Sequence, residues 1–350
     1  MNITDYIDSL PTHRNENYLY TDAFEAMQNI DTIVNASIDA TGIGGSIIGS
    51  VKPIAESSKI ESGIANELIC LNTAAVDDIL NVEFNDQNIQ PVSINLSSNG
   101  GQNVLAQSRV DIVVKANSDG QLILNTNQLQ SAANCVLKIE IEKDAKFDIV
   151  YLQTEKNENP VFVSTLIDVA ENAKVTVSTI NINTAFVRNN LQVNLNGEHS
   201  ELKAYGISKV AGNEHIDNTM WVNHVVPNCT SEELYKSIVA DSAVSAFSGR
   251  IVVAPNAQKT SAQQTCRNML LSADAHAYAK PQLEIYADDV KCSHGATSGQ
   301  IDKAQLFYMQ QRGIDIATAQ QLLTAAFALE VVDKIPISNI QTEITRLLTE

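Results

Sequence analysis

The chain has 350 residues, of which 44% are apolar and 18% charged, and its 41 acidic and 23 basic residues give a formal net charge of −18. This composition predicts a globular protein with a substantial core. The negative charge disfavours nucleic acid and anionic lipid as partners, since no basic patch offsets it. No apolar run reaches the roughly 18 residues of a membrane span, and the acidic N-terminus lacks a signal-peptide pattern. We therefore expect a cytoplasmic protein that binds neither nucleic acid nor membrane.

The cysteines indicate a reducing compartment. Five are present, an odd number, and they are widely spaced without a Cys-x-x-Cys pair: Cys70, Cys135, Cys229, Cys266 and Cys292. This pattern favours reduced thiols over a disulfide framework. It also argues against a closed four-cysteine zinc or cluster site within the chain.

The N-terminal part of the chain combines helical periodicity with turns. Apolar residues between Tyr20 and Ile33 recur near the 3.6-residue period of an amphipathic helix. We expect a mixed helical region over residues 1–80.

From about residue 81 to 301 the pattern changes to short alternating segments separated by polar turns. Strands are predicted at 92–96, 110–115, 135–141, 147–152, 175–182, 202–207 and 250–253. Turns at Asp144, Asn172 and Ser200 each lead into a strand and recur at intervals of about 28 residues. A period in the twenties without long helices predicts a solenoid of stacked coils, with a β-sandwich as the alternative. With only 15 glycines, Asn and Asp must supply most left-handed turn positions.

Residues 302–350 are predicted to be helical. The first helix should end at Gly313, which is a typical C-terminal cap, and Asp315 should cap the second. A third helix is predicted over Ser338–Leu348. We expect a helical appendage on a β body.

The segment Pro281–Thr297 is the richest in chemically active side chains. If residues 290–294 are extended, Cys292 and His294 lie two apart and point to one face. A thiolate and an imidazole suit iron, zinc or copper(I). Two ligands do not complete a site, and the alternative is a buried cysteine beside a hydrogen-bonded histidine. Cys266 lies about one coil before Cys292, a spacing that predicts stacked positions.

Several segments resemble the SufB/SufD family of iron–sulfur cluster assembly scaffolds, and in particular its SufD branch. They are Ser248–Thr260, Gln264–Ser272, Pro281–Gly299, Gln305–Gly313 and, with its Pro-Thr-x-Arg-x-Glu and Tyr-Thr pattern, Leu10–Thr21. The sequence Lys-Cys-Ser-His-Gly-Ala-Thr at Lys291–Thr297 favours SufD over SufB. The middle of the chain matches in strand rhythm only.

The resemblance implies a mainly β fold, a right-handed parallel β-helix over residues 81–301 flanked by the N-terminal region and by a C-terminal region, 302–350, that binds an ATPase. It implies a scaffold without enzymatic activity of its own. The implied partners are a SufB-like paralogue, replaced by a homodimer when the chain is alone, and a SufC-like ATPase. No cofactor would be bound stably by the isolated chain, and iron or an iron–sulfur cluster would form transiently at the SufB–SufD interface.

The same resemblance assigns roles to individual residues. His294 falls on the histidine that the family requires, and Cys292 falls on the cysteine of the same motif. Cys266 stands where many SufD sequences have Asn, so it is either an extra metal ligand or an incidental buried residue. Apolar side chains of the C-terminal helices exceed what three short helices need among themselves. We expect part of this surface to pack on the end of the β-helix and part to bind the ATPase, through Leu306, Phe307, Leu323 and Phe327.

Two other functions remain open at this point. A β-helix polysaccharide lyase would need clustered acidic residues for calcium and a basic catalytic residue, and no such cluster is evident in the sequence. A purely structural solenoid that only binds a partner would need no metal at all.

Overall fold

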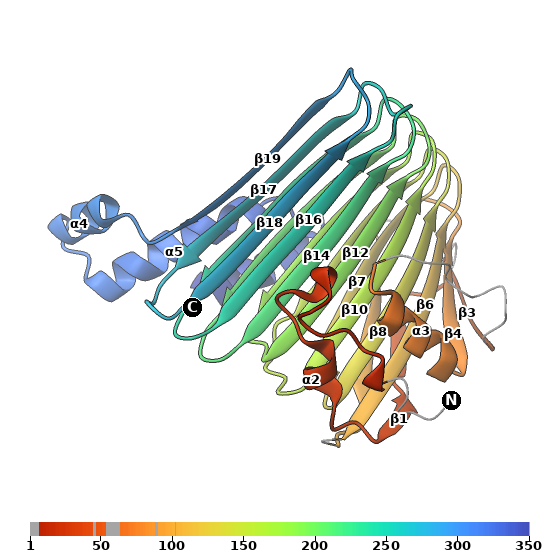
Figure 1. The fold of residues 1–350 in the computed structure, drawn as a ribbon, viewed down its shortest axis with the longest axis horizontal. Helices are drawn as coiled ribbons and strands as arrows, with labels where there is room; N and C mark the ends of the chain where they lie inside the picture. The colour runs from red at the N-terminus through yellow and green to blue at the C-terminus, as the bar shows by residue number, and fades with distance from the viewer. Residues whose placement is uncertain (1–6, 45–46, 54–63, 88–89, 102, 350) are drawn as a thin grey trace.

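The computed structural model describes residues 7–44, 47–53, 64–87, 90–101 and 103–349. Two largely parallel sheets form the body, and from β4 onward the chain alternates between them strand by strand (Figure 1). Sheet A consists, in spatial order, of β18 (His276–Ile285), β16 (Val244–Val253), β14 (His215–His224), β12 (Phe186–Leu195), β10 (Pro160–Val169), β8 (Ala132–Ile141), β6 (Val104–Val114), β4 (Asp78–Phe84) and β3 (Ile47–Pro53), with β1 (Thr32–Asn35) also paired to β6. Sheet B consists of β19 (Lys291–Gly299), β17 (Ser261–Leu270), β15 (Thr230–Val239), β13 (Glu201–Val210), β11 (Lys174–Ile182), β9 (Lys146–Gln153), β7 (Asp119–Leu129), β5 (Val92–Ser98) and β2 (Ser37–Thr41). The predicted parallel β-solenoid is confirmed.

The main core lies between the two sheets. Inward-facing side chains alternate along each strand, as Phe147 and Ile149 do on β9, and they form one continuous apolar cluster. The outward-facing residues between and beyond them, such as Val150 and Leu152, are also buried, because helices cover the outer faces. The middle strands are therefore sealed on both faces.

Polar residues make the corners of the coils, as the scarcity of glycine predicted. Nine described non-glycine residues have positive φ, and six of them are Asn or Asp: Asn117, Asp144, Asn172, Asn183, Asn228 and Asp241. Their short polar side chains tolerate the left-handed region better than other residues with a Cβ do. Asp144 and Asn172 mark the predicted rhythm, which the pairing of Lys146 with Lys174 reproduces.

All seven predicted strands lie in observed strands, apart from Lys115 at the end of β6. Pairing begins earlier than residue 81, because β1, β2 and β3 already belong to the sheets. The helical pattern predicted between Tyr20 and Ile33 forms only the short helix α2 (Ala23–Met27), and the chain then turns into β1. Ala23, Met27 and Ile30 keep the spacing of one helix face and are all buried in one cluster, but the helix itself ends at Met27.

The N-terminal elements cover the outer face of sheet A (Figure 1). They are the 3-10 helix η1 (Glu16–Tyr18), α2 and α3 (Asn66–Ala75). Met27, Leu68 and Leu71 pack with Leu105 of β6 and Phe162 of β10. This face of the sheet is consequently part of a second apolar core.

The C-terminal helices α4 (Lys303–Gln311), α5 (Ile316–Val332) and α6 (Ser338–Thr349) follow the predicted pattern closely. Asp302 and Asp315 cap α4 and α5, and Gly313 has a φ of 84°. The expectation that they pack on the end of the β-helix is wrong, because α5 and α6 bury their apolar side chains on the outer face of sheet B. Helix α4 projects away from the sheets (Figure 1), and none of its side chains is buried.

Every helix in the described ranges is too short or too polar to cross a lipid bilayer.

Candidate functional site

The candidate residues lie on β19, the last strand of sheet B. β19 pairs with β17 along one side, and no other described strand pairs with its second side. β18 ends sheet A in the same way. Almost all side chains of β19 are exposed, whereas those of β15, two strands further in, are almost all buried. The solenoid therefore ends in an open coil.

Cys292 and His294 share the inner face of this coil. They pair in register with Ala262 and Gln264 of β17, which are both buried between the sheets. Side chains of in-register partners point to the same face of a sheet, so the prediction that Cys292 and His294 share a face is confirmed. Cys292 is half-buried, and burial raises the pKa of its thiol. His294 is exposed, so its imidazole is accessible from the open end.

Cys266 does not stack on Cys292. It pairs with Ala296, because in-register partners on β17 and β19, such as Asn268 and Ser298, differ by 30 in residue number. The two cysteines differ by less than this interval, so the predicted stacking is wrong. Cys266 is fully buried, and burial raises the pKa of its thiol to about 12. A thiol that stays protonated at neutral pH is a weak metal ligand, so this geometry favours a core role for Cys266.

Two buried polar residues behind His294 were missed by the sequence analysis. Glu233 on β15 accepts a hydrogen bond of 2.5 Å from Nε2 of Gln264 on β17. Burial raises the pKa of Glu233 to about 8, so this acid is largely protonated at neutral pH. Gln264 lies two residues from Cys266 and thus on the same face, which is the signal that could have revealed it.

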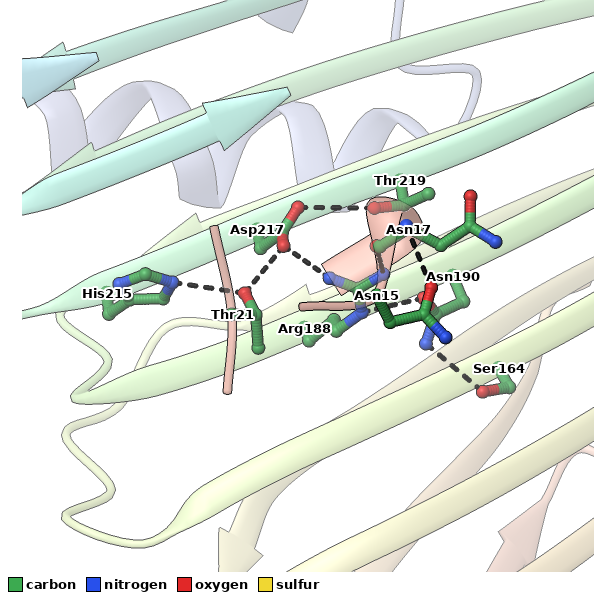
Figure 2. Close-up of polar contacts among 9 residues, drawn as sticks. All are labelled: Asn15, Asn17, Thr21, Ser164, Arg188, Asn190, His215, Asp217 and Thr219. Atoms are coloured by element: carbon green, nitrogen blue, oxygen red, sulfur yellow. Dashed lines mark hydrogen bonds and ion pairs between the residues drawn. The ribbon is translucent and has the colours of Figure 1, made fainter. Parts of the chain in front are cut away.

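A second polar cluster ties the N-terminal segment to the outer face of sheet A (Figure 2). Arg188 on β12 and Asp217 on β14 form a buried ion pair. Arg188 also donates to the carbonyl of Asn17 at 2.6 Å and lies 4.0 Å from the centre of the Tyr18 ring. Thr21 Oγ1 donates to Asp217 at 2.5 Å. Because the charged groups are paired with each other, the cluster anchors the segment that carries the N-terminal motif.

Within the described part of the chain, Cys292 and His294 belong to no group of three potential metal ligands. Among the described residues, the sole group of three potential ligands that lie within 4.8 Å of one another is His13, Asp22 and Glu25, on the N-terminal segment. The described residues supply no third ligand near the pair on β19, and a second chain or solvent could supply one. An open coil at the edge of both sheets is suited to that arrangement.

The four predicted partner-binding residues fall into two environments. Phe307 on α4 is 60% exposed, and Leu306 beside it is partly exposed. Leu323 on α5 is also partly exposed. Phe327 is half-buried on sheet B, where the Lys236 ammonium lies 4.3 Å from its ring centre. Within the C-terminal helices, the exposed apolar side chains are therefore concentrated on α4 and the first half of α5.

Comparisons with known proteins agree with this architecture. The model for the SufBD core domain of the SUF iron–sulfur cluster assembly system matches residues 96–327, more than half of the chain. The chain belongs to the SufBD family. The resemblance noted from its motifs is thereby confirmed, and the chain is a SufD-type member.

Three relatives illustrate the match. The iron–sulfur cluster assembly protein SufD of Escherichia coli K12 is 42% identical over 179 residues, which are 50% of this chain and 42% of the relative. A SufBD family protein of Synechocystis is 31% identical over 251 residues, 68% of this chain and 55% of the relative. The chloroplastic protein ABCI7 of Arabidopsis thaliana is 33% identical over 213 residues, 60% and 44% of the two chains. The chain spans about half the length of these curated relatives.

Proposed function

We propose that this chain is a non-enzymatic scaffold subunit in iron–sulfur cluster assembly, and that clusters form at the open end of its solenoid. The main support is the last coil, which has no described strand on one side and presents Cys292 and His294 on its inner face. Iron is a substrate of this site, held for a time by the His294 imidazole and the Cys292 sulfur. Membership of the SufBD family favours this role over a polysaccharide lyase or a purely structural solenoid.

The open edge is the proposed binding surface for a SufB-like paralogue, with self-association when the paralogue is absent. Long unpaired edge strands are normally shielded by charges, prolines or a covering segment. β19 has a single lysine or arginine side chain, Lys291, at its first position and no proline. Strand addition from a second chain would pair this edge and bring further ligands to Cys292 and His294.

The C-terminal helices are the proposed binding site for a SufC-like ATPase. Exposed apolar side chains gather on α4 and the start of α5, including Phe307, Tyr308 and Ile316. Further along α5, Glu330 accepts hydrogen bonds from Lys236 of β15 at 2.5 Å and from Arg267 of β17 at 3.1 Å. ATPase subunits that close on nucleotide would thus pull on the strand next to β19 and open the edge where the cluster forms.

The scaffold role also fits the state of the cysteines. All five are free, as expected in a reducing compartment such as the cytoplasm.

The experiment is co-purification with a SufB-like paralogue. Ala296→Arg places a long charged side chain on the inner face of the open coil and should abolish pairing. Thr297→Arg, one residue along and on the opposite face, is the matched control and should pair normally. Both residues are exposed, so both variants should keep the wild-type melting temperature. A paired Ala296→Arg complex would contradict the proposed interface.

A further inference from the structure

A buried polar pair lies behind the candidate site, on the inner face of the solenoid. Glu233 and Gln264 are each 1% exposed. The carboxamide of Gln264 occupies the space above Gly249 of sheet A, where an added Cβ would come within 2.2 Å of Nε2. The absence of a side chain at Gly249 is therefore what admits the amide between the sheets. The amide is held there by its hydrogen bond to Glu233.

The oxygen of this amide accepts no hydrogen bond from the described residues. This oxygen, Gln264 Oε1, is buried. A buried acceptor left in this state destabilises the fold. Nε2 is directed to Glu233 on β15. The other strand that neighbours β17 is β19.

β19 supplies a donor at this place. His294 is the in-register neighbour of Gln264, and neighbouring strands are about 4.8 Å apart. The nearest other inward-facing residues of β19, Cys292 and Ala296, are each two positions away along the strand.

We propose that Gln264 is a positioning residue for His294: its Oε1 accepts a hydrogen bond from one imidazole nitrogen, and Glu233 orients the amide so that the oxygen faces β19. The second imidazole nitrogen is then left unprotonated and directed out of the open coil. Histidines that bind metals commonly donate their other N–H to a carbonyl or carboxylate, which fixes the tautomer. This inference rests on the proposed role of His294 in binding iron and adds two buried residues to that site.

The test is the tautomer of His294 in the full chain, read from the imidazole ¹⁵N chemical shifts at about pH 8. The wild type should show one dominant tautomer. Gln264→Met keeps the volume of the side chain but removes the acceptor, and should give a mixture of tautomers. Asn268→Leu is the control, because Asn268 faces inward on the same strand but bonds to Ser298 at 3.1 Å. That variant should keep the wild-type tautomer.

Zn²⁺ binding to the full chain gives a second readout. Gln264→Met should weaken it by about tenfold or more, as loss of such a partner does at other sites, and Asn268→Leu should leave it unchanged. Gln264→Glu retains an acceptor oxygen and should restore the single tautomer. If Gln264→Met does not fold, Gln264→Asn withdraws the amide by one methylene and should produce the same mixture.

Mixed tautomers in the wild type, or a single tautomer that persists in both Gln264→Met and Gln264→Asn, would overturn the positioning role. Either result leaves the role of His294 in cluster assembly standing, because that role is measured separately with His294→Ala. Conversely, a tautomer that depends on Gln264 together with normal assembly by His294→Ala would retain the positioning role and remove the proposed function.

Discussion

β15 and β19 belong to the same sheet, with only β17 between them, and they carry the same alternation of inward and outward side chains. On β15 the inward-facing Glu233 and Tyr235 are sealed by coils on both sides. On β19 the inward-facing Cys292 and His294 have a coil on one side only. One backbone geometry thus makes a core in the middle of the solenoid and an accessible site at its end. In this molecule, inward-facing side chains become accessible to partners and ligands where the stack of coils ends.

The largest expected effect is the loss of stability when a buried ion pair on the middle coils is removed. Arg188→Met leaves the buried Asp217 carboxylate without its charged partner, which should lower the free energy of unfolding by about 3–5 kcal/mol. Arg250→Met is the matched control nearer the open end, where Arg250 and Glu284 pair at 2.7 Å but remain about one-third exposed. It should cost about 1 kcal/mol or less. Equal losses in urea-induced unfolding of the two variants would contradict the contrast.

Two glycines allow the packing of the middle coils to be compared with that of the last coil. A Cβ on Gly206 of β13 would lie 2.2 Å from the ring of Tyr235 on the neighbouring strand, whereas nothing lies within 4 Å of a Cβ on Gly295 of β19. Gly206→Ala should therefore destabilise the chain by about 1–3 kcal/mol through overpacking. Gly295→Ala should change stability by no more than about 0.5 kcal/mol. Thermal unfolding of both variants measures the difference, and a tolerated Gly206→Ala would show that the middle coils can relax.

The buried acid of β15 should make stability depend on pH. Because burial raises the pKa of Glu233 to about 8, the folded chain keeps a proton that the unfolded chain, with a pKa near 4.3, releases. The folded state binds more protons between these two values, so stability falls as pH rises through that window. Between about pH 6.5 and 8, Glu233→Gln should reduce this decline, which has a limit of about 1.4 kcal/mol per pH unit for one proton.

Below about pH 6.5, His224 has the opposite effect on stability, so the contribution of Glu233 is measured above that pH. Burial lowers the pKa of His224 to about 4, so its contribution rises with pH only up to the pKa of a free imidazole, near 6.5. Urea-induced unfolding at several pH values would give the two slopes. Parallel curves for the wild type and Glu233→Gln would mean that Glu233 is ionised in the folded chain.

Local chemistry made much of the fold predictable. Asp144 and Asn172 reveal the coil rhythm because a left-handed corner without glycine favours Asn or Asp. Asp315 and Gly313 mark helix ends because capping depends on a few neighbouring residues. Strands β12 and β14 escaped prediction because Arg188 and Asp217 interrupt their apolar pattern. Those residues are buried by an N-terminal segment that lies far away in the sequence.

Local spacing predicted one part of the candidate site. A separation of two residues was enough to place Cys292 and His294 on one face. The register of Cys266 was not predictable, because it depends on the length of a whole coil, which is longer between β17 and β19 than between β9 and β11. That Gln264 and Glu233 lie side by side likewise follows only from the register between neighbouring strands. Exposure of β19 also follows only from its place as the last strand of the sheet.

We expect the exposed, inward-facing imidazole of His294 in the open coil to serve cluster assembly and not folding. The most direct test of this role is the iron and acid-labile sulfide bound, under anaerobic conditions, by the complex of this chain with a SufB-like paralogue and a SufC-like ATPase. With His294→Ala, we expect a normal melting temperature, normal partner binding and a loss of cluster. Ser293→Ala, at the adjacent outward-facing and exposed position, should retain the cluster. A His294→Ala complex that assembles clusters at the wild-type level would contradict this role of His294.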